Sequence, residues 1–167
     1  MRALGYLIRM VIKHFFPLAA LLIGSITAPA QKLQSIPLPP SQNPTNADLP
    51  VAGATWAGNM LFVSGWLDPD MKTHTDTTSQ TVGILKDIQK FLETQHLTFA
   101  DVAMVRVFLG TGADGKADTA GMTAGYRQFF GTKEQPHKPA RTTLQVVLPA
   151  ATRGALVEID MVVVRQK

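Results

Sequence analysis

The sequence predicts an α+β fold, a layer sandwich in which two helices cover one face of a mixed β-sheet. Segments with strand-like alternation and segments with helical spacing follow one another between residues 51 and 167 in the order β-β-α-β-α-β-β. That order is typical of helices segregated to one side of a sheet. The stretch is long enough for a single domain with a sizeable core. Because the chain has no cysteine, this core must be stable without disulfides.

Residues 1–30 have the three-part pattern of a secretory signal peptide. Their beginning is basic and contains no carboxylate: Arg2, Arg9 and Lys13. A mostly apolar run follows, and small residues end at Ala30, after which we expect cleavage. The alternative is an uncleaved anchor, but the run contains Pro17 and is shorter than the roughly 18 residues that a span needs. We therefore expect a periplasmic or secreted protein with no membrane attachment after cleavage.

The distribution of charge argues against nucleic acid as the main partner. The sequence contains 16 basic and 12 acidic residues, for a net charge of +4. Three of the basic residues lie in the signal peptide, so the chain after Ala30 has 13 basic and 12 acidic residues. Phosphate binding requires a concentrated basic face. A nearly neutral mature chain predicts no nucleic-acid partner.

The mature chain is predicted to begin with a tether and a hairpin. Residues 31–50 contain five prolines among Ser, Asn, Gln and Thr, which favours extended, solvated backbone. The domain is expected to begin at Val51. Residues 55–56 and 60–65 flank the turn 57–59, and their alternation predicts a β-hairpin.

Periodicity next predicts a helix and a strand. Apolar residues that recur at intervals of three and four indicate a helix from Thr77 to Gln95. Thr77 and Gln80 have the spacing of a capping box at its start. Residues 102–109 are mainly apolar at both alternating sets of positions, so we expect a strand that is covered on both faces.

A second helix and two strands complete the predicted domain. Asp118 is placed to cap the helix and Gly131 to end it. Residues 141–147 and 155–165 are the last two strands. Two helices cover only one face of such a sheet, so apolar residues on the other face need another cover. Self-association would supply that cover.

Several common kinds of site find no support in the sequence. The glycine-rich loop 110–115 is followed by Lys116 and Ala117, which do not complete a phosphate-binding Walker loop. The histidines are scattered, and cysteine is absent, so we expect no metal site. No serine lies in a Gly-x-Ser-x-Gly elbow, which leaves acyl-transfer hydrolysis unsupported.

Two charged residues, Arg141 and Glu158, lie in predicted strands whose neighbours are largely apolar. A charge inside a buried strand is costly unless it is paired or used. One interpretation is that the two residues pair with each other or face solvent at a sheet edge. The other is that Arg141 holds a substrate carboxylate through its two-pronged donor geometry while Glu158 handles a proton.

Five short segments follow one another in register between Val51 and Arg165. They are residues 58–65 (GNMLFVSG), 80–88 (QTVGILKDI), 126–130 (YRQFF), 139–143 (PARTT) and 157–160 (VEID). Together they resemble the Rid (reactive intermediate deaminase) family, also called YjgF. The resemblance implies a chorismate-mutase-like fold and a homotrimer with active sites in the clefts between subunits. It also implies hydrolysis of 2-imino acids to 2-oxo acids and ammonia, without a metal or an organic cofactor.

The resemblance also implies roles for individual residues. Arg141 matches the arginine that binds the substrate carboxylate, and Glu158 matches the glutamate that positions the attacking water. Thr143 falls where the family has a small polar residue whose backbone meets the substrate, and Ser64 and Gly65 fall on the strand that lines the cleft. An arginine near Glu158 would favour its ionised form, which suits a base.

The sequence leaves two questions open. Trp66 is either a core or interface aromatic or a wall of the cleft that favours bulky imino acids, and Thr123 replaces an asparagine common in the family. The protein itself is either an imine deaminase or a non-catalytic trimer that binds a small carboxylate or a partner protein in the same cleft. The ribonuclease activity proposed for some relatives is disfavoured by the low net charge.

Overall fold

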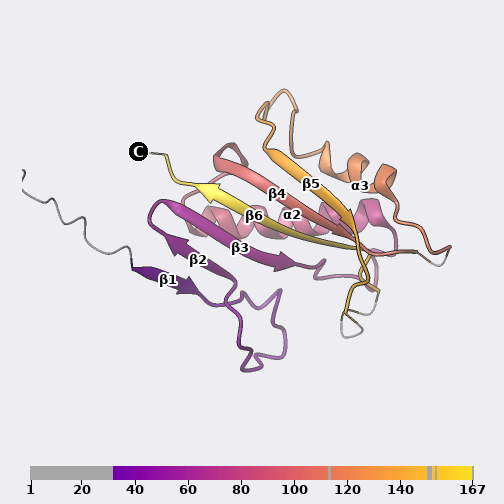
Figure 1. Cartoon of the computed structure of the whole chain (residues 1–167), viewed down its shortest axis with the longest axis horizontal. Coiled ribbons are helices and arrows are strands. Elements are labelled where there is room, and N and C mark those ends of the chain that lie inside the picture. Colours follow the sequence, from indigo (N-terminus) through magenta and orange to yellow (C-terminus); the bar gives the residue numbers. More distant parts are fainter. Residues whose placement is uncertain (1–31, 113, 150–151, 153, 167) are drawn as a thin grey trace, which may run out of the picture. The chain divides into compact units, whose positions relative to one another are not determined.

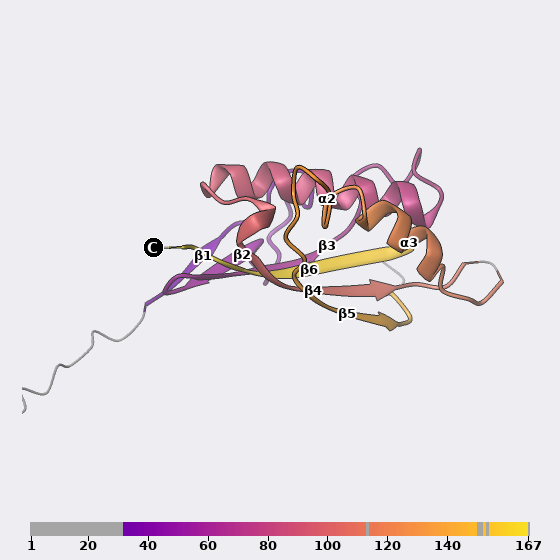
Figure 2. The same ribbon diagram turned by 90° about the horizontal axis from the view of Figure 1, so that it is seen from above.

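In the described part of the chain, six β-strands form one mixed sheet, and two α-helices lie against one of its faces (Figure 1, Figure 2). The computed structural model describes residues 32–112, 114–149, 152 and 154–166. The predicted signal peptide lies outside the described residues, so cleavage and export stay predictions. The elements in chain order are β1 (Leu33–Ile36), β2 (Ala54–Ala57), β3 (Met60–Trp66), α2 (Thr77–Thr94), the 3-10 helix η1 (Phe99–Asp101), β4 (Val102–Leu109), α3 (Thr119–Tyr126), β5 (Ala140–Gln145) and β6 (Val157–Val164).

The strands are arranged in the order β1-β2-β3-β6-β4-β5. Neighbouring strands are antiparallel, except that β4 and β5 run parallel. A parallel pair requires a crossover connection, and the segment containing α3 provides it. The α+β class and the mixed sheet with helices on one face are confirmed. Within the described residues, no helix combines the length and the apolar character needed to cross a membrane.

The segment predicted as a solvated tether, residues 31–50, is partly built into the fold. Its residues Leu33–Ile36 form the edge strand β1, which pairs along its whole length with β2. The Gln42 side chain exchanges two hydrogen bonds with the backbone of Leu67 and donates a third to Asp87. Prolines are compatible with this arrangement because all five follow β1, where the chain needs no ladder hydrogen bonds.

Helix α2 begins one residue earlier than a capping box at Thr77 and Gln80 would require. Asp76 is the N-cap, and its carboxylate accepts a hydrogen bond from the backbone N–H of Ser79. Asp is among the preferred N-cap residues because it satisfies a free helical N–H. Gln80 is instead buried and ties α2 to the segment before β6: it donates to the carbonyl of Gly154 and accepts from the backbone N–H of Leu156.

Helix α3 is capped as predicted but is shorter than predicted. The Asp118 carboxylate accepts a hydrogen bond of 2.8 Å from the backbone N–H of Gly121. The α-helix ends at Tyr126, and the backbone continues in turns to Phe130, whose N–H donates to the Tyr126 carbonyl. Gly131 has a φ of +72° and ends this region, in a conformation that glycine adopts readily.

The core lies between the helices and one face of the sheet. Trp66 is fully buried in it, with its ring centroid 5.0 Å from that of Phe91. This position confirms the interpretation of Trp66 as a core aromatic. The sheet contributes alternate residues of its three central strands to the same layer: Leu61, Val63, Val105, Val107, Leu109, Val157, Ile159, Met161 and Val163.

The opposite face of the sheet has no covering layer among the residues that the structure describes. It exposes large apolar side chains, including 42% of Phe62 and 51% of Leu144. The expectation that strand 102–109 is covered on both faces is therefore wrong for the single chain. Arg106 on β4 lies on this face and pairs with Asp160 on β6 at 2.7 Å. The uncovered face also carries Glu158, one of the predicted site residues.

Candidate functional site

Glu158 is half-buried on the uncovered face, because its neighbours Val157 and Ile159 point into the helix-covered core. The pairing of β3 with β6 shifts register between Val63 and Trp66. This irregularity brings the backbone of Gly65 against the Glu158 side chain, where a Cβ atom would overlap the carboxylate oxygen Oε1. Glycine is thus required at residue 65 for the carboxylate to keep its position.

Ser64 lies beside Gly65, but its side chain forms a hydrogen bond with the protein backbone. The Ser64 hydroxyl donates a hydrogen bond of 2.6 Å to the carbonyl of Ala52. The Ser64 backbone N–H donates to the carbonyl of Gly53. Ser64 therefore holds the segment before β2 against β3. We call Ser64, Gly65 and Glu158 the glutamate half-site.

The pKa of Glu158 is raised above its ordinary value, chiefly by burial and secondarily by the nearby Asp160 carboxylate. The expectation that an arginine beside Glu158 favours its ionised form is wrong for the single chain. Arg106, which lies on this face, forms an ion pair with Asp160 and not with Glu158. A carboxyl group with a raised pKa is a stronger base when ionised, which suits proton transfer near neutral pH.

Arg141 lies on the edge strand β5, beside helix α3. Its guanidinium group stacks on the ring of Tyr126, 4.7 Å from the ring centroid, and one of its nitrogens lies 3.8 Å from the sulfur of Met122. Arg141, Tyr126 and Thr123 line one pocket of about 640 Å³. The predicted residue Thr143 lies two positions further along β5.

Two hydroxyl groups near Arg141 are buried without a hydrogen-bond partner among the described residues: those of Tyr126 and Thr143. Burial raises the pKa of Tyr126 to about 12, against a smaller opposing effect of Arg141. Buried polar groups are normally satisfied, so these two hydroxyl groups depart from the usual pattern. We call Thr123, Tyr126, Arg141 and Thr143 the arginine half-site.

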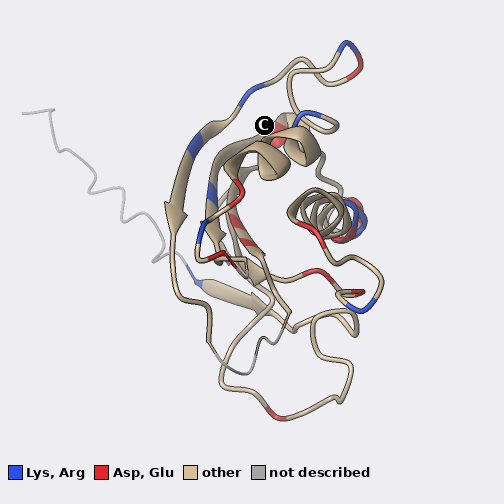
Figure 3. Ribbon diagram, turned by 90° about the vertical axis from the view of Figure 1, so that its right-hand side faces the viewer, with Lys and Arg blue, Asp and Glu red and all other residues tan. Residues whose placement is uncertain are grey.

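The structure does not bring the two half-sites together within one chain. Strand β4 separates β5 from β6, and Figure 3 shows basic and acidic positions on different strands of the sheet. Arg141 is in register with Val105, which faces the helices, whereas Glu158 is on the opposite face. The interpretation that Arg141 and Glu158 pair with each other is therefore wrong for the single chain.

Sequence reasoning missed two further residues of the Arg141 pocket, Arg127 and Lys138. A signal for Lys138 is present in the charge pattern. Between Glu134 and Glu158 the chain carries basic residues and no acidic residue. Only the fold shows that Arg127, which comes from the end of α3, lines the same pocket.

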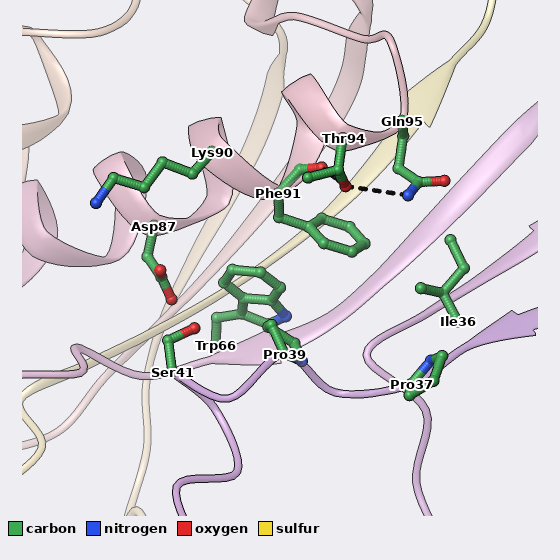
Figure 4. Close-up of a pocket in the computed structure, with 10 residues that line it drawn as sticks. All are labelled: Ile36, Pro37, Pro39, Ser41, Trp66, Asp87, Lys90, Phe91, Thr94 and Gln95. Carbon is green, nitrogen blue, oxygen red and sulfur yellow. Dashed lines mark hydrogen bonds between the residues drawn. The ribbon is translucent and has the colours of Figure 1, made fainter.

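A second pocket, of about 310 Å³, lies between the N-terminal segment and helix α2 (Figure 4). Ile36, Pro37 and Pro39 form one wall, and Phe91 and Trp66 lie opposite. Neither Arg141 nor Glu158 lines it. Trp66 belongs to this helix-side pocket and not to the glutamate half-site. Among the described residues, no three His, Asp or Glu side chains gather as a potential metal site.

Substituting Gly65 by alanine should displace the Glu158 carboxylate, because the added methyl group and Oε1 cannot occupy the same space. We expect the loss of any proton-transfer activity that uses Glu158, with a folded protein by circular dichroism. Ala57→Gly, at the end of β2, is a control for a change of one methyl group elsewhere in the hairpin. Normal activity in Gly65→Ala would show that the position of Glu158 is unimportant.

The chain is similar to several known proteins over most of its length. A family model described as endoribonuclease L-PSP matches residues 44–165. A RutC family protein from Pyrococcus horikoshii is 32% identical over 122 residues, which are 70% of this chain and 88% of that protein. A Thermotoga maritima structure, described as a candidate endoribonuclease, is 27% identical, with a TM-score of 0.58 and coverage of 72% of this chain and 91% of its own. The fold is also similar to that of a Rid family protein from Yersinia pestis, with a TM-score of 0.62 at 24% identity over 80% of this chain and all of that one. The matched range includes both half-sites.

Proposed function

We propose that this chain, which belongs to the endoribonuclease L-PSP family, also called the YjgF or Rid family, hydrolyses 2-imino acids to 2-oxo acids and ammonia. Membership supports a role in binding or deaminating small molecules. One observation supports the finer proposal. The half-buried carboxyl group of Glu158 has a raised pKa and contacts the backbone of Gly65, and it lies on the uncovered apolar face of the sheet.

The proposed chemistry divides between the half-sites. Arg141 binds the substrate carboxylate and so orients the electrophilic C=N carbon. Ionised Glu158 accepts a proton from water as the water oxygen bonds to that carbon. Glu158 then returns the proton to the nitrogen of the resulting carbinolamine. As the C–N bond breaks and ammonia leaves, Glu158 accepts the remaining hydroxyl proton, so that the C=O bond of the 2-oxo acid forms. Each step needs only the substrate, water and these side chains.

The proposal requires that Arg141 and Glu158 come from different copies of the chain, since they face opposite sides of one sheet. The uncovered apolar face, with Phe62 and Leu144 exposed, would pack against neighbouring copies. We propose a homotrimer with three equivalent sites between subunits.

Light scattering on the purified protein should give about three times the subunit mass, because burying the uncovered face stabilises the assembly. Phe62→Asp should dissociate it, since a carboxylate would be buried in an apolar contact. Val51→Asp is a control at a comparably exposed apolar residue outside the sheet. A wild-type protein that stays monomeric at micromolar concentration would contradict the shared site.

The activity itself can be tested with imines made in situ by an amino-acid oxidase and trapped by semicarbazide. The deaminase hypothesis predicts less trapped imine as protein is added. The competing hypothesis, a non-catalytic module that binds small carboxylates, predicts binding of 2-oxo acids without faster imine loss. Both hypotheses use the same arginine pocket, so only a measurement of the rate of imine hydrolysis distinguishes them.

A further inference from the structure

Among the described residues, three cationic side chains and no carboxylate line the Arg141 pocket. They are Arg127, Lys138 and Arg141. Both ion pairs found in the described part of the chain, Arg106 with Asp160 and His74 with Asp68, lie elsewhere. Like charges gathered around one cavity repel each other and favour an anionic occupant. The mature chain is nearly neutral, so this concentration of charge is local.

Lys138 is held at the pocket by packing. Its aliphatic stem lies over Gly131, where a Cβ atom would come within 2.8 Å of the lysine Cε. The segment between them is closed by a hydrogen bond of 3.2 Å from the Gly131 N–H to the His137 carbonyl. The His137 ring nitrogen Nε2 lies 2.7 Å from the carbonyl of Val102 and fixes the segment to β4.

The pocket also has an apolar surface beside its charges. Tyr126 and Phe130 stack with ring centroids 4.6 Å apart, and both are largely buried. Arg141 lies over the Tyr126 ring. A ligand with a short carbon chain can therefore contact the aromatic pair while its ends meet positive charge. One anionic group needs one arginine, so the two remaining cations are in excess for a monocarboxylate.

We propose that the preferred substrate is a dicarboxylic 2-imino acid of four or five carbons. This inference rests on the proposed function, because it names the substrate of the same site. Arg141 holds the carboxylate next to the C=N group, as before. Lys138 and Arg127 hold the second carboxylate at the other end of the ligand. The cavity of about 640 Å³ has room for such a molecule.

Calorimetry with two product-like ligands tests the second carboxylate directly. Both 2-oxoglutarate and 2-oxopentanoate have five carbons, but only the first is a dicarboxylate. The purified protein should bind 2-oxoglutarate about tenfold more tightly, the gain expected for one added charge-assisted contact. Lys138→Met should remove most of this preference. Lys133→Met, an exposed residue in the same segment, should keep it. Equal affinity of wild type for the two ligands would overturn the inference.

Measuring the hydrolysis of two imines tests this inference separately from the proposed function. Imines of glutamate and norvaline, generated by oxidases, differ in the same carboxylate. Faster hydrolysis of both without a preference for the glutamate imine would support the deaminase and refute the dicarboxylate substrate. A binding preference for 2-oxoglutarate, lost in Lys138→Met, with no faster hydrolysis of either imine would support the anion pocket and refute the deaminase.

Discussion

Arg141→Lys is expected to lower kcat/KM for imine hydrolysis about a hundredfold, because lysine keeps the charge but loses the two-pronged geometry that orients a carboxylate. The guanidinium group also stacks on Tyr126, which an ammonium group on a flexible stem reproduces poorly. The side chain is exposed and has no carboxylate partner in the described chain. The melting temperature should therefore stay close to that of wild type.

Arg165→Lys is the matched control for this substitution. Arg165 also stacks on an aromatic ring, 4.2 Å from the centroid of Trp56, and it donates to the carbonyl of Gln95. It follows β6 at the opposite end from Glu158 and lines no part of the Arg141 pocket. Activity should be unchanged in this control. Wild-type activity in Arg141→Lys would remove Arg141 from the site.

Glu158→Gln should reduce hydrolysis about 10²- to 10⁴-fold, the range typical for the loss of a general base. The amide has the same shape and cannot accept the proton from water. Wild-type activity should fall as the pH drops through the pKa of Glu158, and this midpoint should lie above the ordinary value for glutamate because burial and Asp160 raise it. The residual activity of Glu158→Gln should lack that midpoint in rate measurements across pH.

The same substitution should stabilise the fold at neutral pH. A raised folded-state pKa means that folded Glu158 binds its proton more tightly than the unfolded chain does. This tighter proton binding stabilises the folded protein at pH values below the unfolded-state pKa of Glu158. The stabilisation is lost as the pH rises through the folded-state pKa. Thermal melts should show Glu158→Gln above wild type at pH 7, with the difference vanishing in acid. A less stable variant at pH 7 would mean that ionised Glu158 has a favourable partner in the assembly.

Asp101→Asn is the control for removing a carboxylate charge elsewhere. Asp101 belongs to a local capping box with Thr98, where its carboxylate accepts from the Thr98 backbone N–H. The variant should lose some stability, because this helical cap is weakened. It should retain the wild-type dependence of activity on pH. The opposite signs of the two stability changes separate a functional carboxylate from a structural one.

Local sequence patterns were sufficient for most of the elements. Alternation placed the strand at 102–109 where β4 lies, and helical spacing placed α2 to within one residue of its end. Asp118 was recognised as a cap because its effect is confined to the first turn that follows it. The α+β class followed from the order of these segments. All of these features depend on contacts between residues that are close in sequence.

The composition of the candidate site was decided by contacts between residues that are distant in sequence. The sequence alone determined that Arg141 and Glu158 lie in strands and that Gly65 precedes Trp66. Alternation defines two faces for each strand, but it does not say which strands are neighbours or which faces meet the helices. Only the tertiary structure placed β4 between β5 and β6, set Arg141 against α3, and left Glu158 on the uncovered face. The tertiary structure also placed residues 33–36 in an edge strand and brought Lys138 and Arg127 to one pocket. Strand pairing and loop packing join segments that are distant in sequence, and the sequence of one such segment does not indicate which other segment it contacts.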